Sequence, residues 1–256
     1  MSPTLKAILL VVALFALPGQ RAFGVITPKP SDLFPNKYEM DNVAQGVDPN
    51  ASTSQWTFFT NTTPSSASLS GGSLNLNTGI AAARRWTATS SASHSVGSTI
   101  EIRLRVDSAS DDQTAVPFAA DRAFQLRLGD NNEAGILEIG LNHTYWRGSS
   151  APSSTLTLNV DSNSDGMHVF RIAQDANSSL YSVWRDDELI GSNLVTGFAA
   201  LDSVFGDNTG NYGGTGAFDY VRYDYTGGFG PIPEPSCALL LGLGGLLVWR
   251  RRAQRK

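Results

Sequence analysis

Hydrophobic and polar side chains alternate along much of the chain. In residues 99–106, apolar side chains stand at every second position, between Glu101, Arg103 and Arg105. A period of two is typical of a β-strand with one buried and one solvated face. The same alternation predicts six further strands, near residues 124–128, 137–141, 155–160, 167–173, 179–185 and 218–225.

Short polar clusters separate these predicted strands. Residues 130–133, 161–166 and 186–187 are rich in Asp and Asn, which tolerate the backbone geometry of tight turns. Since no helical periodicity extends beyond a turn or two, we predict an all-β, antiparallel β-sandwich made by one domain, residues 25–226. The Ser-, Thr- and Asn-rich segments 50–63 and 65–77 are predicted to form edge strands and long surface loops.

The amino-terminal residues have the pattern of an export signal. Lys6 precedes an apolar run at residues 7–17, and the small residues Ala22 and Gly24 match the positions that signal peptidase requires. We therefore expect residues 1–24 to be a signal peptide that signal peptidase removes before Val25. These residues are excluded from the predicted fold.

The carboxyl-terminal residues combine a short proline motif, an apolar run and a basic end. The motif is Pro233, Glu234 and Pro235, residues 236–249 are predominantly apolar, and the basic tail 250–256 begins with Arg250, Arg251 and Arg252. As a helix the apolar run is about 21 Å long, which is short for a hydrocarbon core of roughly 30 Å. We predict one short transmembrane helix that anchors the chain transiently; a core helix with a charged end is the alternative.

This order of features resembles the PEP-CTERM sorting signal of Gram-negative bacteria. The resemblance implies recognition by an exosortase, a membrane-embedded cysteine transpeptidase-like enzyme. The positive-inside rule places the arginines in the cytoplasm and residues 25–234 outside the inner membrane. We expect an exported protein of the cell envelope, outer surface or extracellular matrix, with residues 227–232 as the linker to the signal. Removal and retention of the helix are both compatible with this pattern.

The exported region is acidic and has no disulfide. Residues 25–232 contain twelve Lys and Arg against twenty-two Asp and Glu, a net charge near −10. Such a surface repels nucleic acid and anionic lipid and attracts Ca²⁺ or cationic partners, although acidity more commonly serves solubility. The single cysteine, Cys237, lies in the sorting segment. The domain must therefore be held by its hydrophobic core.

A second resemblance involves the later part of the predicted sandwich. Residues 165–172, 181–190, 205–208 and 218–223 are similar to the concanavalin A-like jelly rolls of the laminin-G, lectin and glucanase type. The resemblance implies a hairpin whose first strand ends at Trp184 and Arg185 and whose second strand carries Leu189 and Ile190. The fold includes both binding modules and glucanases, so function must be argued from the site.

The sequence lacks the carboxylate pattern of a glucanase. Retaining glycosidases hold two carboxyl groups about 5 to 5.5 Å apart, and the resemblance implies a Glu-x-Asp-x-(x)-Glu strand, which this chain does not contain. Glu101 and Glu138 are single carboxylates that we expect to be solvated. His94, His143 and His168 have no neighbour at metal-ligand spacing. We predict no catalytic residue and no cofactor, with a glycan-active hydrolase as the alternative.

One polar turn has the oxygen spacing of a calcium loop. Asp161, Asn163 and Asp165 match the first half of an EF-hand loop, but the twelfth position is Ile172 instead of Glu. A plain turn is favoured over a weak Ca²⁺ site, because Asp, Asn and Gly commonly cluster in turns.

Three aromatic residues are the candidate ligand contacts. Tyr145, Trp146 and Tyr212 are predicted to lie at or next to loop tips, where their rings can stack on sugar faces. The alternative is that the tryptophans belong to the core, which we expect for Trp184 because it lies within a regular strand. The sequence thus predicts a noncatalytic binding or structural domain with extracellular polysaccharide as the candidate partner.

Overall fold

The computed structural model describes ten segments of the chain. They are residues 26–40, 56–60, 65–80, 83–88, 93–111, 121–130, 132–149, 155–199, 202–208 and 212–232. The predicted signal peptide, the motif Pro233, Glu234 and Pro235, the apolar run 236–249 and the arginines Arg250, Arg251 and Arg252 lie outside these segments. Within the described segments, no helix is long and apolar enough to cross a membrane.

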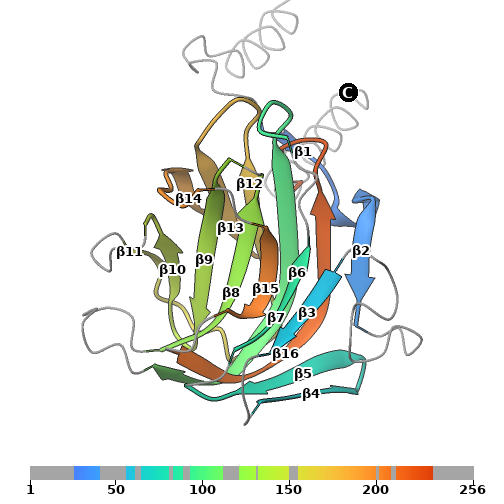
Figure 1. Cartoon of the computed structure of the whole chain (residues 1–256), viewed down its shortest axis with the longest axis vertical. Coiled ribbons are helices and arrows are strands. Elements are labelled where there is room, and N and C mark those ends of the chain that lie inside the picture. The colour runs from blue at the N-terminus through green and yellow to red at the C-terminus, as the bar shows by residue number, and fades with distance from the viewer. Residues whose placement is uncertain are drawn as a thin grey trace, which may run out of the picture.

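Two antiparallel β-sheets pack face to face around one core (Figure 1). The seven-stranded sheet has the order β11 (Thr155–Asn159), β10 (Thr144–Arg147), β9 (Ala134–Gly140), β8 (Arg122–Gly129), β15 (Ser203–Asp207), β6 (Arg84–Ala88), β3 (Trp56–Thr60). The eight-stranded sheet has the order β14 (Glu188–Leu194), β13 (Tyr181–Arg185), β12 (His168–Gln174), β7 (Ser98–Asp111), β16 (Tyr212–Asp224), β5 (Ser73–Thr78), β4 (Ser65–Ser70), and β2 (Asn36–Glu39) also pairs with β16. The predicted antiparallel β-sandwich is confirmed.

The alternating apolar residues form the core, as their period predicts. Ile102 and Leu104 of β7 are at most 1% exposed, whereas Arg103 between them is partly exposed. Phe124 of β8 meets Phe218 of β16 edge to face across the two sheets, with ring centroids 4.9 Å apart. Burial of such apolar surface is the main force that holds a domain without disulfides together.

The sheet edges agree with the sequence in part. β3 and β4 end the two sheets, as predicted for the Ser- and Thr-rich segments. β11 is also an edge strand, and its Leu156 and the following Val160 are 52% and 69% exposed. The expected burial of the apolar side of this strand is therefore wrong. Only Leu158 packs partly against the core, since β11 pairs with β10 alone.

The predicted hairpin through Asp186 and Asp187 is present. β13 and β14 are joined by these two residues, whose φ angles are 49° and 68°. A two-residue turn with positive φ at both positions matches the right-handed twist of the strands, and Asp tolerates this conformation.

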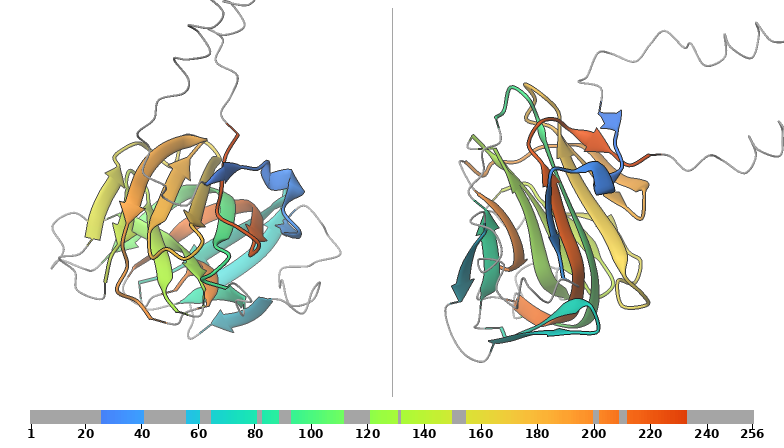
Figure 2. Two further views of the ribbon diagram at one scale, coloured as in Figure 1. Left: turned by 90° about the horizontal axis from the view of Figure 1, so that it is seen from above. Right: turned by 90° about the vertical axis from the view of Figure 1, so that its right-hand side faces the viewer.

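The segment 26–40 crosses the outer face of the eight-stranded sheet, beside the end of the described chain (Figure 2). β1 (Thr27–Pro28) pairs in parallel with β17 (Phe229–Gly230), and a 3₁₀ turn, η1 (Ser31–Leu33), leads to β2. Lys29 N donates to Gly230 O at 3.0 Å. Residues 229–230, predicted to be linker, therefore belong to the domain.

Candidate functional site

Glu101 is buried, although alternation predicts a solvated carboxylate. It is 1% exposed on the outer face of β7. Its Oε2 accepts a hydrogen bond from Arg171 Nε at 2.6 Å, and its Oε1 accepts one from the Tyr220 hydroxyl at 2.9 Å. The segment 26–40 covers this pair: Arg171 Nη1 donates to Lys29 O at 3.1 Å, and the guanidinium lies 5.2 Å from the Phe34 ring centroid.

A pocket of about 300 Å³ lies beside Glu101 on this face. Its polar lining consists of Ser31, Asp32, Glu101, Arg171, Asp187, Tyr220 and Arg222. Its apolar lining consists of Pro30, Val169, Pro231 and Ile232. This volume is at the lower end of the range of small-molecule pockets, roughly 300 to 1,000 Å³, which suits one sugar residue better than a long stretch of chain.

The polar groups of the pocket are held in place by one another. Arg222 donates from Nε to Glu39 Oε1 at 2.8 Å and from Nη1 to Ser31 Oγ at 3.0 Å. Its guanidinium lies 4.0 Å from the Tyr220 ring centroid, within cation–π range. Burial and then the charge of Glu101 raise the pKa of Tyr220. The phenol therefore stays protonated and acts as a hydrogen-bond donor.

Glu138 is also buried, at 0% exposure on β9. Arg122 Nη1 donates to its Oε2 at 3.1 Å, and Arg147 Nη1 donates to its Oε1 at 3.2 Å. The expectation of a solvated side chain is therefore wrong for this residue too. With a guanidinium on each oxygen, the carboxylate is a structural ion-pair partner.

The three candidate stacking residues are inside the protein. Tyr145, Trp146 and Tyr212 are 0%, 2% and 1% exposed, because β10 and β16 extend through these positions. Trp146 packs its ring against Tyr181 with centroids 5.3 Å apart. Their predicted placement at exposed loop tips is wrong. Trp184, expected in the core, is instead partly exposed on the outer face beside Gly230, since the core-facing residues of β13 are its odd-numbered neighbours.

Other contacts of these aromatic residues are polar. The Tyr145 hydroxyl donates to Asp121 Oδ1 at 2.8 Å, and Trp146 Nε1 donates to Val195 O at 2.8 Å. The guanidinium of Arg122 lies 4.8 Å from the Tyr212 ring centroid. These residues thus connect strands of the fold, and none of them lines the pocket beside Glu101.

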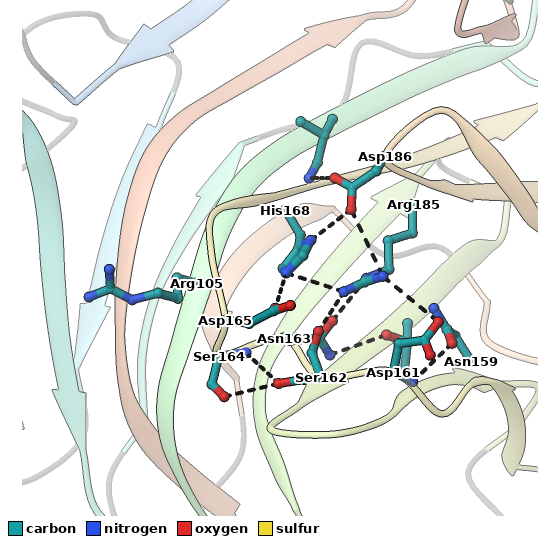
Figure 3. A network of polar contacts seen from close by, with 12 residues as sticks. Arg105, Asn159, Asp161, Ser162, Asn163, Ser164, Asp165, His168, Arg185 and Asp186 are labelled. Atoms are coloured by element: carbon teal, nitrogen blue, oxygen red, sulfur yellow. Dashed lines mark hydrogen bonds and ion pairs between the residues drawn. The ribbon is translucent and has the colours of Figure 1, made fainter.

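A guanidinium lies among the oxygens of the candidate calcium loop (Figure 3). Arg185 donates from Nε to Asn163 Oδ1 at 3.1 Å and from Nη2 to Ser162 O at 2.5 Å. Asp165 Oδ1 pairs with His168 Nε2 at 2.8 Å, and the side chain of Asp161 is 69% exposed. Arg185 thus takes the Asn163 side-chain oxygen and the neighbouring carbonyl, and His168 takes Asp165, an arrangement of Asp161, Asn163 and Asp165 that agrees with a plain turn.

The fold brings His94, Asp130 and Glu133 together, although they do not have metal-ligand spacing in the sequence. His94 Nδ1 lies 2.8 Å from Asp130 Oδ2, and Glu133 is the third member of this cluster. Ligand atoms of the three lie within 4.8 Å of one another. Gln174 Nε2 lies between the acids, 3.0 Å from Asp130 Oδ2 and 2.9 Å from Glu133 Oε1. The expectation that His94 has no neighbour at metal-ligand spacing is wrong. The two carboxylates already accept hydrogen bonds from the Gln174 amide nitrogen.

No protein-family model matches the chain. No curated protein matches it either. Among solved structures, a carbohydrate esterase from the Shiga toxin-encoding bacteriophage phi24B has a TM-score of 0.51 and 13% identity, covering 73% of this chain and 95% of that one. A laminarinase catalytic domain from Thermotoga petrophila has a TM-score of 0.48 and 15% identity, covering 74% and 96%. A carbohydrate-binding module from Bacillus subtilis has a TM-score of 0.42 and 9% identity, covering 66% and 95%.

These likenesses concern the fold. The match to the phage protein, together with the two packed antiparallel sheets, supports a jelly-roll architecture for this chain. Identities of this size do not transfer an activity, because one fold hosts many functions.

Proposed function

We propose that this chain is an exported surface or matrix protein whose domain binds a neutral, hydroxyl-rich glycan unit in the pocket beside Glu101 without cleaving it. The main support for the proposal is that Glu101 is buried and already hydrogen-bonded. It is the one buried carboxylate of the pocket lining, and it already accepts hydrogen bonds from Arg171 and Tyr220. A carboxylate held in this way can orient neighbouring donors, but it is poorly placed to move a proton.

The chemistry of the lining supports a sugar as the ligand. Fixed hydroxyl, carboxylate and guanidinium groups can donate to and accept from adjacent sugar hydroxyls. Asp32 and Asp187 at the exposed rim add negative charge, while Arg171 and Arg222 are paired with Glu101 and Glu39. The balance of charge favours a neutral sugar over an acidic one.

A hydrolase remains the second candidate because of one contact. Some glycosidases use a tyrosine nucleophile, and the Tyr220 hydroxyl donates to Glu101 in the pocket at 2.9 Å. The raised pKa of Tyr220 opposes formation of the phenolate that such a nucleophile needs. We therefore infer that Tyr220 and Glu101 orient a bound ligand and do not react with it.

The sorting part of the proposal rests on the sequence. The pattern of residues 233–256 supports recognition by an exosortase, and that of residues 1–24 supports removal by signal peptidase. The motif begins three residues after β17 ends at Gly230. Processing near the motif would leave the whole pocket on the mature protein.

The test measures binding and sugar release by the mature protein from its exporting host. We expect retention on a neutral glucan gel and no release of reducing sugar. Asp32→Asn should weaken binding roughly tenfold if the rim carboxylate accepts a sugar hydroxyl. Asp107→Asn is the matched control, since Asp107 is an exposed residue of β7 paired with Arg105 and lies outside the pocket lining.

Two results would contradict the proposal. Sugar release that disappears in Tyr220→Phe or Glu101→Gln, with folding retained, would favour the hydrolase. Equal binding of neutral glucan by wild type, Asp32→Asn and Asp107→Asn would show that the pocket is not the binding site.

A further inference from the structure

His94, Asp130 and Glu133 meet where strands of both sheets begin or end. Asp130 and Glu133 flank the turn from β8 to β9 in the seven-stranded sheet, and His94 precedes β7 of the eight-stranded sheet. In the described part of the chain they are the only group of three such side chains whose ligand atoms all lie within 4.8 Å of one another. None of them lines the pocket beside Glu101.

The two carboxylates of this cluster lack a full positive partner. The side chains of Asp130 and Glu133 are 0% and 14% exposed. Within the described segments their ion-pair contacts are to His94, at 2.8 and 3.9 Å. Even a protonated His94 supplies one positive charge for two negative ones. Because a charge removed from water is costly without a partner, the cluster favours a further cation.

Four acceptors surround one amide nitrogen in this cluster. Gln174 Nε2 lies 3.0 Å from Asp130 Oδ2 and 2.9 Å from Glu133 Oε1. Ser178 O and His94 Nδ1 lie 3.1 and 3.4 Å from the same nitrogen. An amide nitrogen has two hydrogens, so it cannot donate to all four acceptors. The cluster therefore offers more electron pairs than the amide can use, as the surroundings of a bound cation do.

Gln174 can turn to present its oxygen to the cluster. The residue is 0% exposed at the end of β12, and Ser98 Oγ donates to its Oε1 at 3.5 Å. A half-turn of the amide exchanges its nitrogen and oxygen, and Ser98 then accepts from the nitrogen, because a hydroxyl both donates and accepts. A cation would also become the partner that the Ser178 carbonyl then lacks. The amide oxygen is thus available as a fourth ligand.

A buried phenol without a hydrogen-bond partner lies on the same side of the sheet. Tyr181 of β13 pairs with Gln174 of β12, so the two side chains point to the same face. Tyr181 is 0% exposed, and its hydroxyl has no hydrogen-bond partner, since the nearby Gly135 amide does not reach hydrogen-bond geometry. Burial, and then the charges of Glu133 and Asp130, raise the pKa of Tyr181. A buried hydroxyl in this state indicates a missing partner, such as a water molecule on a bound ion.

We propose that this cluster, with Gln174 as the fourth ligand, is a zinc-binding site that links the two sheets. An imidazole nitrogen and carboxylate oxygens are ligands that Zn²⁺ prefers, whereas Ca²⁺ takes oxygen ligands only. The 29% exposure of the His94 side chain gives the ion a route from solvent. The ion joins the β8–β9 turn to the segment before β7 and to the end of β12. In a domain without cysteine, this link supplies the stabilisation that a disulfide would give.

The experiment adds Zn²⁺ to the untagged mature protein after treatment with a chelator. Isothermal titration should show one saturable site, and Zn²⁺ at a hundredfold excess over Kd should raise the Tm by about 5 °C or more. Ca²⁺ and Mg²⁺ should each bind at least about tenfold more weakly. His94→Ala should weaken Zn²⁺ binding about tenfold or more.

His168→Ala is the matched control. His168 also lies beside two carboxylates, but Asp186 and Asp165 contact opposite nitrogens of its ring, so the three do not face one ion. Zn²⁺ binding that is unchanged in His168→Ala and weakened in His94→Ala supports the site. Equal weakening in the two variants, equal affinity for Zn²⁺ and Ca²⁺, or no saturable Zn²⁺ binding by wild type overturns the proposal.

A second variant covers the case in which His94→Ala does not fold. Glu133→Gln removes the charge from a side chain that is 14% exposed, and its amide oxygen can keep the hydrogen bond from Gln174. Zn²⁺ affinity that is unchanged in Glu133→Gln also overturns the proposal. The outcome of the neutral glucan experiment bears only on the pocket, because the two sites share no residue.

Discussion

Arg185 Nε donates a hydrogen bond to Asn163 Oδ1 at 3.1 Å, and this contact fills the oxygen cluster that resembles half a calcium loop. Asn163 is 0% exposed, and its Nδ2 donates in turn to Gly140 O at 2.9 Å. The loop 161–166 is therefore joined to β13 by a side-chain cation and to β9 by an amide. A metal ion bound to Asn163 Oδ1 would have to displace the Arg185 guanidinium.

Loss of Arg185 should destabilise the fold. We expect Arg185→Ala to lower the free energy of unfolding by about 2 kcal/mol, because a buried amide oxygen and a carbonyl lose a charged donor. Asp161→Ala should cost well under about 1 kcal/mol, since this side chain is 69% exposed. Urea titration measures both variants. A Ca²⁺-dependent rise of the wild-type midpoint that is absent in Asp161→Ala would contradict this view of the loop.

The two faces of β7 should differ in their sensitivity to truncation. Leu104→Ala should cost about 2 to 5 kcal/mol because it removes a core side chain that is 1% exposed. Arg103→Ala should cost well under about 1 kcal/mol, since its pair with Asp219 is partly exposed to solvent. Urea titration of the two variants, adjacent in sequence, is the check, and equal losses would mean that the strand does not have one core face.

Stability should fall in acid through Asp224. Burial alone would raise the pKa of this carboxyl, but hydrogen bonds from Lys29 and Thr226 outweigh burial and lower it. A folded-state pKa below the unfolded one, about 3.9, gives stability that is present above the unfolded pKa and lost as pH falls through the folded pKa. The stability difference between wild type and Asp224→Asn should therefore be largest near neutral pH and shrink in acid.

The measurement is unfolding by urea at several pH values between about 7 and 3. Asp161→Asn, at an exposed carboxylate, serves as the control and should follow wild type. If the difference in unfolding free energy between wild type and Asp224→Asn stays constant across this range, the ionisation of Asp224 does not make stability depend on pH.

The mature ends of the protein should reflect both export signals. In a host with an exosortase, we expect the mature chain to begin near Val25 and to lack Arg250, Arg251 and Arg252, because the 14-residue span 236–249 is short for a permanent anchor. Intact-mass analysis of surface material measures both ends. Material that mostly retains the arginine tail would contradict processing.

Local patterns were sufficient for the strands and their turns. The period of two in residues 99–106 identified which side chains of β7 enter the core, and Asp186 and Asp187 identified a hairpin, because both signals depend on neighbours in sequence. The same information placed Glu101 on the solvated face. It could not show that Lys29 and Phe34, far away in the chain, cover that face and turn Glu101 and Arg171 into a buried pair.

The candidate sites depended on contacts between distant segments. The sequence alone determined an antiparallel β-sandwich between two export-like ends and the absence of a catalytic Glu-x-Asp-x-Glu strand. Only the tertiary structure decided that Tyr145, Trp146 and Tyr212 are buried and that Asp130 meets His94. The physical reason is that alternation fixes the side of a strand on which a residue lies, whereas exposure and partners are set by whichever element packs over that side.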